Sequence, residues 1–248
     1  MLVDQPVRAK RHEKVGFTSA DGLALRGCLH LPAARRPPVV IGCHGLFSSA
    51  ESGKQQTLAQ NCNRRGMAFL RFDHRGCGAS EGDFKAVTSL AGRMRDLAAA
   101  AAMLSARTDL APRMGLFGSS MGGTVCLAMA ARLNVAAVVT LAAPVRSQPV
   151  LAAIARSAER ERVAERLNPE NLHFDIAAQI DGIHTLLLFH GDADAVVPVA
   201  SAREIYARAV EPKAMRIFPR GDHRMSAPRD QAVFQQEAAD WFARYLVG

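Results

Sequence analysis

One serine of this 248-residue chain stands in a glycine frame that is typical of a nucleophile. The segment 118–122, Gly-Ser-Ser-Met-Gly, follows an apolar run that ends at Phe117 and precedes an alanine-rich segment with helical spacing. A sharp strand-to-helix turn needs small residues two positions before and after its central residue, whose side chain then projects at the edge of the sheet. The frame selects Ser120, because Phe117 and Met121 stand where a frame around Ser119 would need glycine. The alternative is a serine in an ordinary glycine-rich or anion-binding turn.

A serine hydroxyl is a weak nucleophile, so it needs a base and an acid that orients this base. His223 stands in a turn before the C-terminal helical segment, where an imidazole could reach a serine at the sheet edge. Asp192 and Asp194 both follow a strand-like run, and the spacing leaves both open as the orienting acid. Unrelated catalytic triads show only a few orders of their residues along the chain, and the order serine, aspartate, histidine is found in one fold. The alternative for a lone aspartate here is a helix cap before Pro198.

A second turn has the composition of an oxyanion hole. The segment 44–47, His-Gly-Leu-Phe, follows a strand-like run at 39–43. Glycine lets backbone amides converge above a nucleophile, so we expect the amides of Leu46 and Met121 to hold the oxyanion of a tetrahedral intermediate. Removing one such donor costs about 10² to 10³ in rate, so this element is expected wherever the serine is catalytic.

A glycine-spaced loop at 72–82 follows the next strand-like run. It lacks the Lys-Ser/Thr pair of a phosphate-binding loop, and no helix follows it in dinucleotide-binding spacing. We expect Arg75 to form an ion pair with Asp73 that holds this loop beside the 44–47 turn. Contact between Arg75 and a substrate is the alternative.

Short continuous apolar runs indicate strands that are covered on both faces. They lie at 39–43, 67–70, 114–117, 135–141, 186–189 and, more weakly, 215–218. Segments with helical spacing separate them, the clearest at 87–104, which predicts right-handed β-α-β units. Alternating leucines within 17–31 predict an antiparallel hairpin before the first of these strands. The predicted fold class is therefore α/β, with a mostly parallel central sheet, an N-terminal hairpin and helices on both faces.

One interval departs from this alternation. From 144 to 183 there is no strand-like run, and about 40 residues exceed a simple crossover. We expect residues 145–183 to form a small helical cap over one end of the sheet. No linker, repeat or composition break divides the rest, so residues 1–248 are expected to form a single domain.

Taken together, five motifs resemble those of serine hydrolases with the α/β-hydrolase fold, and the similarity covers nearly the whole chain. They are the segments 44–46, 73–80, 118–122, 190–198 and 221–223. The most similar branches are the cinnamoyl or feruloyl esterase-like and the serine-aminopeptidase-like hydrolases. The pattern H-G-x-x-D-x-x-V of this family falls on His190 to Val197, and the resemblance therefore implies Asp194 as the triad acid rather than Asp192. It implies a catalytic triad of Ser120, Asp194 and His223, and no metal or organic cofactor.

The expected function is the hydrolysis of a small-molecule carboxylic ester through an acyl-enzyme intermediate. The same triad serves amide and thioester bonds, so an aminopeptidase-like enzyme or a thioesterase is the first alternative. The second is a non-catalytic binding protein with the same fold, although no triad member is missing.

Composition restricts the partners and the compartment. A net charge of +8 would suit nucleic acid, but the cations are scattered among acids, without a basic run and interleaved aromatics, so no nucleic-acid partner is expected. No apolar run spans a bilayer, and the N-terminus does not read as a secretory signal. Five cysteines without metal-ligand spacing favour a reduced, cytoplasmic protein, for which a homodimer is an allowed assembly.

Overall fold

The computed structural model describes residues 11–158 and 160–248, which contain eight strands. These are β1 (Arg11–Thr18), β2 (Ala24–Leu31), β3 (Val39–Cys43), β4 (Ala68–Phe72), β5 (Met114–Ser119), β6 (Ala137–Leu141), β7 (Leu186–Gly191) and β8 (Lys213–Phe218). They form one sheet in the order β1-β2-β4-β3-β5-β6-β7-β8. β2 pairs antiparallel with both β1 and β4, and every other pairing, from β4 through β3 to β8, is parallel.

Each apolar run of the sequence overlaps a strand of this sheet, although the runs at 67–70 and 135–141 begin one and two residues before their strands. Every residue of β3, β4, β6 and β7 is buried, because helices cover both faces of the sheet there. The N-terminal hairpin is present and extends back to Arg11, with Thr18 opposite Ala24 at its turn. The predicted α/β fold class, with its antiparallel start, is confirmed. The N-terminal stretch expected not to be a secretory signal extends over residues 1–10, outside the described residues.

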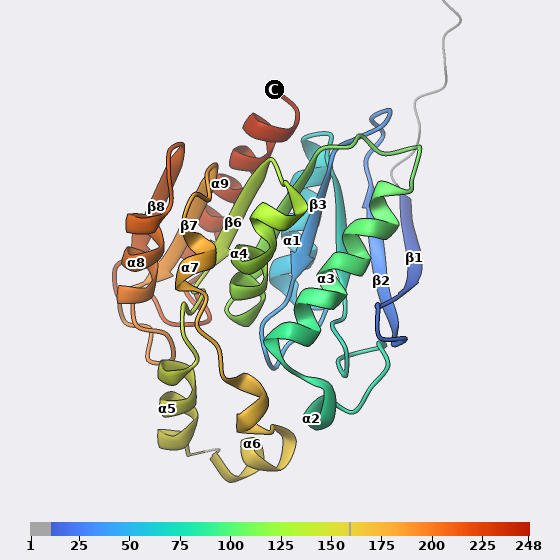
Figure 1. The fold of residues 1–248 in the computed structure, drawn as a ribbon. Coiled ribbons are helices and arrows are strands. Elements are labelled where there is room, and N and C mark those ends of the chain that lie inside the picture. The colour runs from blue at the N-terminus through green and yellow to red at the C-terminus, as the bar shows by residue number, and fades with distance from the viewer. Residues whose placement is uncertain (1–10, 159) are drawn as a thin grey trace, which may run out of the picture.

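Helices form one layer on each face of the sheet (Figure 1). On one face lie α1 (Gly53–Arg64) and α9 (Pro228–Leu246), which pack against each other and against a core rich in phenylalanine. On the other lie α3 (Leu90–Ser105), α4 (Met121–Leu133), α7 (Ala177–Ile180) and α8 (Ala200–Arg208), over a core of Leu, Val, Ile and Ala. These two layers fix the strand ends from which the site residues project.

The helical segment expected at 87–104 is two helices. α2 (Phe84–Val87) ends before Thr88, and α3 begins at Leu90. The Ser89 hydroxyl accepts a hydrogen bond from the Gly92 amide at 3.0 Å, which caps the new helix. The apolar spacing continues across the break, so periodicity alone missed it. No helix among the described residues is long and apolar enough to cross a membrane.

The segment expected to form a cap, 145–183, holds α5 (Gln148–Arg156), α6 (Arg160–Arg166), the short 3-10 helix η1 (Pro169–Leu172) and α7. Figure 1 shows α5 and α6 beside α2 at the lower end of the view, away from the chain's C-terminus. Apolar side chains of this segment pack on the turns that follow β3 and β5. The last part of the segment differs, because Ile176, Ile180 and Ile183 are buried in the main core.

Candidate active site

Ser120 stands at a strained turn between β5 and α4. Its backbone has φ 52° and ψ −123°, a conformation that costs a residue other than glycine about 1–3 kcal/mol. The two framing glycines are required by space: a Cβ on Gly118 would lie 2.3 Å from the Gly122 carbonyl oxygen, and one on Gly122 would lie 2.1 Å from that of Cys43. The structure thus gives the physical reason for the frame that selected Ser120.

Three side chains from distant parts of the chain form one hydrogen-bonded series. His223 Nε2 lies 3.1 Å from Ser120 Oγ, and His223 Nδ1 lies 2.8 Å from Asp194 Oδ2. The Asp194 carboxylate is fully buried, whereas the His223 side chain is 21% exposed. This is the geometry of a nucleophile, its base and the acid that orients the base. Asp192 does not join the series, because its Oδ1 accepts the Arg220 amide instead.

Asp194 is held from several sides. Its Oδ1 accepts the amides of Val196 and Val197, both at 2.8 Å. A second buried imidazole, His190, lies with Nε2 3.3 Å from Asp194 Oδ2. Burial opposes ionisation of this carboxyl, but the hydrogen bonds of His190 and His223 outweigh it and lower the pKa of Asp194 well below its ordinary value. The carboxylate is therefore ionised at neutral pH.

The candidate oxyanion turn is fixed by a buried arginine that sequence reasoning missed. Arg93 of α3, which is fully buried, donates to the carbonyls of His44 and Gly45 at 3.2 Å and of Leu46 at 3.1 Å. The Gly45 carbonyl and the Leu46 N–H belong to the same trans peptide and point in opposite directions. Because the Gly45 carbonyl faces Arg93, the Leu46 N–H points away from Arg93. Among the described residues neither this amide nor that of Met121 donates to another protein group. Neither donor is thus used within this part of the protein.

The expected ion pair between Arg75 and Asp73 is wrong. Arg75 binds Asp21 through both terminal nitrogens, at 2.7 and 2.8 Å, and donates from Nε to Asp96 at 2.9 Å. Both Asp73 oxygens accept backbone amides of neighbouring turns. A two-point hydrogen-bonded contact with the carboxylate of Asp21 is more favourable for the Arg75 guanidinium than a contact with Asp73 in its own loop. Arg75 is 3% exposed and structural, as expected.

Comparison with known proteins assigns the family. The model of the family described as serine aminopeptidase, S33, matches residues 35–179. This chain belongs to the S33 serine aminopeptidase family. YfhR, an uncharacterized protein of Escherichia coli K12, is 29% identical over 243 residues, which cover 94% of this chain and 81% of YfhR.

Two solved structures show the same fold as this S33-family hydrolase. The esterase Pf2001 of Pyrococcus furiosus matches with a TM-score of 0.82 at 20% identity, over 97% of this chain and 92% of that one. The esterase domain of a Rhodothermus marinus protein matches with a TM-score of 0.71 at 26% identity, over 95% and 100% of the two chains. The resemblance to α/β hydrolases is therefore confirmed.

The hydrolase has a cavity of about 940 Å³ that includes Ser120 and His223. Its walls come from the turn after β3, the first turns of α1, helices α5 and α6, and the loop that carries His223. Such a volume suits a small-molecule ligand. Among the described residues, no group of three or more His, Cys, Asp or Glu side chains could hold a metal ion.

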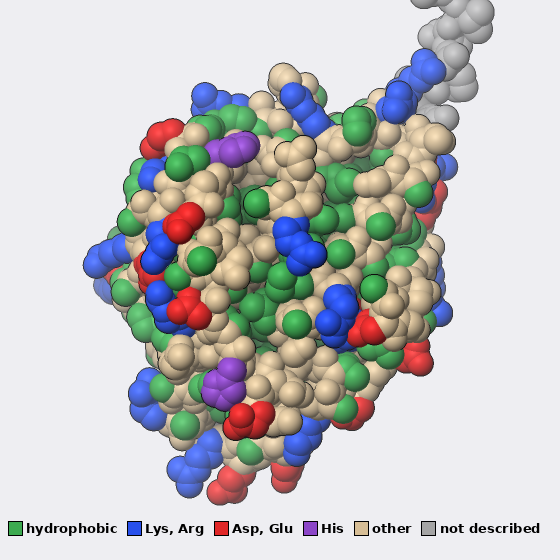
Figure 2. All heavy atoms as spheres, viewed as in Figure 1, with side chains coloured by type: hydrophobic (Ala, Val, Ile, Leu, Met, Phe, Trp, Pro, Cys, Tyr) green, Lys and Arg blue, Asp and Glu red, His purple; other side chains and the backbone are tan. Residues whose placement is uncertain are grey.

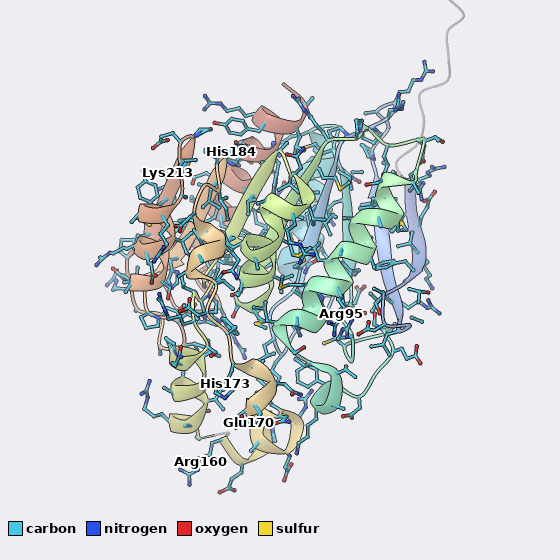
Figure 3. All side chains as sticks on the ribbon, in the orientation of Figure 1. Arg95, Arg160, Glu170, His173, His184 and Lys213 are labelled. Carbon is cyan, nitrogen blue, oxygen red and sulfur yellow. The ribbon has the colours of Figure 1, made fainter. Side chains whose placement is uncertain are left out.

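The outer surface has no single sign of charge on the face shown in Figure 2, where Lys and Arg are intermixed with Asp and Glu. The charge of the segment 145–183 is mixed as well: Figure 3 shows Arg160, Glu170 and His173 on it, and His173 Nε2 lies 3.6 Å from Glu170 Oε2.

Proposed function

We propose that this protein is a serine hydrolase that cleaves carboxylic esters, with Ser120 as nucleophile, His223 as base and Asp194 as orienting acid. The observation that carries the proposal is the unbroken hydrogen-bonded series of these side chains at the strained turn of Ser120, inside a cavity of substrate size. Two similar solved structures are described as esterases, which supports the choice of ester bonds.

The reaction follows from the positions of the protons. Ser120 Oγ attacks the ester carbonyl carbon while its proton passes to His223 Nε2, and the resulting oxyanion accepts the amides of Leu46 and Met121. The C–O bond to the alcohol then breaks, and the alcohol takes the proton from His223. Water, activated by the same imidazole, attacks the acyl-enzyme and releases the carboxylic acid. Asp194 keeps Nδ1 protonated throughout, so that Nε2 is free to accept.

An aminopeptidase reaction is the alternative that the family description raises. A free amino terminus is a cation, and its recognition would need carboxylates near the serine. Among the described residues that line the cavity there is no Asp or Glu. This favours esters over peptides with a free amino terminus.

The test compares the wild type with Ser120→Ala on p-nitrophenyl acetate and butyrate, with methyl ferulate and an aminoacyl-nitroanilide as further substrates. The wild type is expected to hydrolyse the esters and not to cleave the anilide. The kcat of Ser120→Ala should fall by at least about 10⁴-fold while the variant remains folded. An alanine variant with wild-type turnover would rule out the proposed nucleophile. Preferential cleavage of the anilide would favour the aminopeptidase reaction.

A further inference from the structure

One wall of the cavity carries two cations. Lys54 and Gln55, in the first turn of α1, line the same cavity as Ser120, together with Arg224, which directly follows His223 in the chain. The wall formed by α5 and α6 is different in kind, since it presents Val150, Ile154 and Val163. A ligand that spans the cavity therefore meets an apolar side and a cationic side.

Neither cation forms an ion pair with another described residue. Within the described residues, neither Lys54 nor Arg224 has a carboxylate within ion-pair distance. The acid whose charge reaches Lys54 is Asp222, and both of its oxygens already bind Ser226, from the amide at 2.7 Å and the hydroxyl at 2.6 Å. Burial lowers the pKa of Lys54 from its ordinary value; Asp222 acts against this change and Arg224 adds to it. Two like charges thus face one cavity, and a bound anion would relieve their repulsion.

The Gln55 amide lies behind this wall, against the sheet. Its side chain is buried, with the whole residue 1% exposed, and among the described residues neither Nε2 nor Oε1 has a hydrogen-bond partner. Oε1 lies close to β3, because a Cβ placed on Gly42 would come within 2.6 Å of it. Neither polar atom is accessible to solvent, so Lys54 and Arg224, rather than Gln55, are the groups on this wall that a ligand can touch. The N-terminus of α1, capped by Ser52, adds its partial positive charge at this position.

We propose that Lys54 and Arg224 bind a carboxylate carried by the substrate, so that the preferred ester has an anionic group on its acyl or its alcohol part. This inference rests on the proposed ester hydrolysis. With the ester carbonyl at Ser120, the cavity of about 940 Å³ leaves room for such a group on the side of Arg224. An Arg fork and an ammonium offer several donors to the two oxygens of a carboxylate.

The test measures kcat/KM for two matched pairs of esters. In one pair, 4-acetoxybenzoate and its methyl ester, the carboxylate is on the alcohol part; in the other, mono-(4-nitrophenyl) glutarate and its methyl ester, it is on the acyl part. We expect the charged member of at least one pair to be preferred by about 10- to 100-fold, the effect of hydrogen bonds to a charged group. The preferred pair identifies which part of the substrate carries the carboxylate.

The variants Lys54→Met and Arg224→Met, singly and together, are expected to reduce this preference toward a ratio of one. The matched control is Arg132→Met, which removes one positive charge from an exposed position at the far end of α4, about 17 Å along the helix from Met121. Its ratio should equal that of the wild type. No preference in either pair, or a preference that survives in the double variant, would overturn the carboxylate site and leave the proposed ester hydrolysis untouched.

Binding to Ser120→Ala makes the test independent of turnover. Calorimetric titration of this variant with the charged and neutral esters should show tighter binding of the charged member, and the difference should disappear when Lys54→Met and Arg224→Met are added. Equal binding of both members would refute the carboxylate site even if the wild type cleaved no ester. Loss of turnover with preserved preferential binding would instead refute the ester reaction alone.

Discussion

Asp194→Asn replaces one oxygen of the proposed triad by an NH₂ group and should fix His223 in the wrong tautomer. Two backbone amides, those of Val196 and Val197, donate to Oδ1 at 2.8 Å. In an asparagine only the oxygen can accept these donors, so the side-chain NH₂ must take the place of Oδ2 and face His223. The NH₂ would donate to Nδ1, so the imidazole would carry its proton on Nε2. In that tautomer Nε2 cannot accept the serine proton.

The size of the loss in kcat distinguishes a lost hydrogen bond from a wrong tautomer of His223. Loss of a hydrogen bond to a charged group alone would cost about 1.5–3 kcal/mol, or roughly 10- to 100-fold in rate. Fixing the wrong tautomer raises the loss to about 10⁴-fold in kcat, or roughly 5.5 kcal/mol. We expect the larger value in a p-nitrophenyl acetate assay near neutral pH, with an unchanged circular dichroism spectrum.

The matched control is Asp192→Asn, two residues earlier in the same turn, where the carboxyl accepts only the Arg220 amide. This change should leave kcat within about threefold of the wild type, as surface substitutions usually do. A loss below about 100-fold in Asp194→Asn, or equal losses in both variants, would refute the reasoning on the tautomer.

Three further predictions concern stability. Ser120→Gly should relieve the positive φ and raise the free energy of unfolding by roughly 1 kcal/mol in denaturant titration, while ester turnover is lost; a less stable variant would argue against stored strain. Gly122→Ala should fail to fold or lose several kcal/mol, because its Cβ would overlap the Cys43 carbonyl, whereas Gly53→Ala, with open space around it, should keep the wild-type melting temperature. Folding lowers the pKa of Asp194, so the contribution of this carboxylate to stability is present above about pH 5 and is lost as pH falls through the folded-state pKa. Asp194→Asn should therefore flatten the decline in melting temperature between about pH 5 and 3. An unchanged decline would contradict this.

The sequence could predict the parts of the fold that depend on local pattern. Each parallel strand is buried on both faces, and a continuous apolar run reports that burial directly. The break at Thr88 was missed, because a polar cap interrupts the backbone without interrupting the apolar stripe. Helix ends depend on single caps, which periodicity averages out.

The same distinction applies to the site. Ser120 could be selected from the sequence because the glycines that frame it are close to it in the chain. The structure explains these glycines, because a Cβ on Gly118 or Gly122 would overlap backbone atoms. The choice of Asp194 over Asp192 needed a family resemblance, since spacing left both open. Arg93 and His190 were missed, because their roles depend on where another element lies: Arg93 contacts a turn 47 to 49 residues away in sequence. A buried cation on an otherwise apolar helix face is the one signal that could have indicated Arg93.

The same limit applies to the charge of the chain. A net charge of +8 gave no reason to single out Lys54 or Arg224, which lie 170 residues apart in sequence. The fold brings both to the cavity of Ser120, away from the carboxylates that pair with many of the other cations. Only the tertiary structure shows that these two cations lie on the wall of one cavity.

The central claim is that Ser120 is the activated nucleophile of this chain, and labelling with a fluorophosphonate probe tests it most directly. Peptide mapping by mass spectrometry after labelling should place one adduct on Ser120, and Ser120→Ala should acquire none. The neighbouring Ser119 is the internal control, because it shares the peptide but not the contact with His223. An adduct on Ser119, or a folded wild type that does not label at all, would contradict the account.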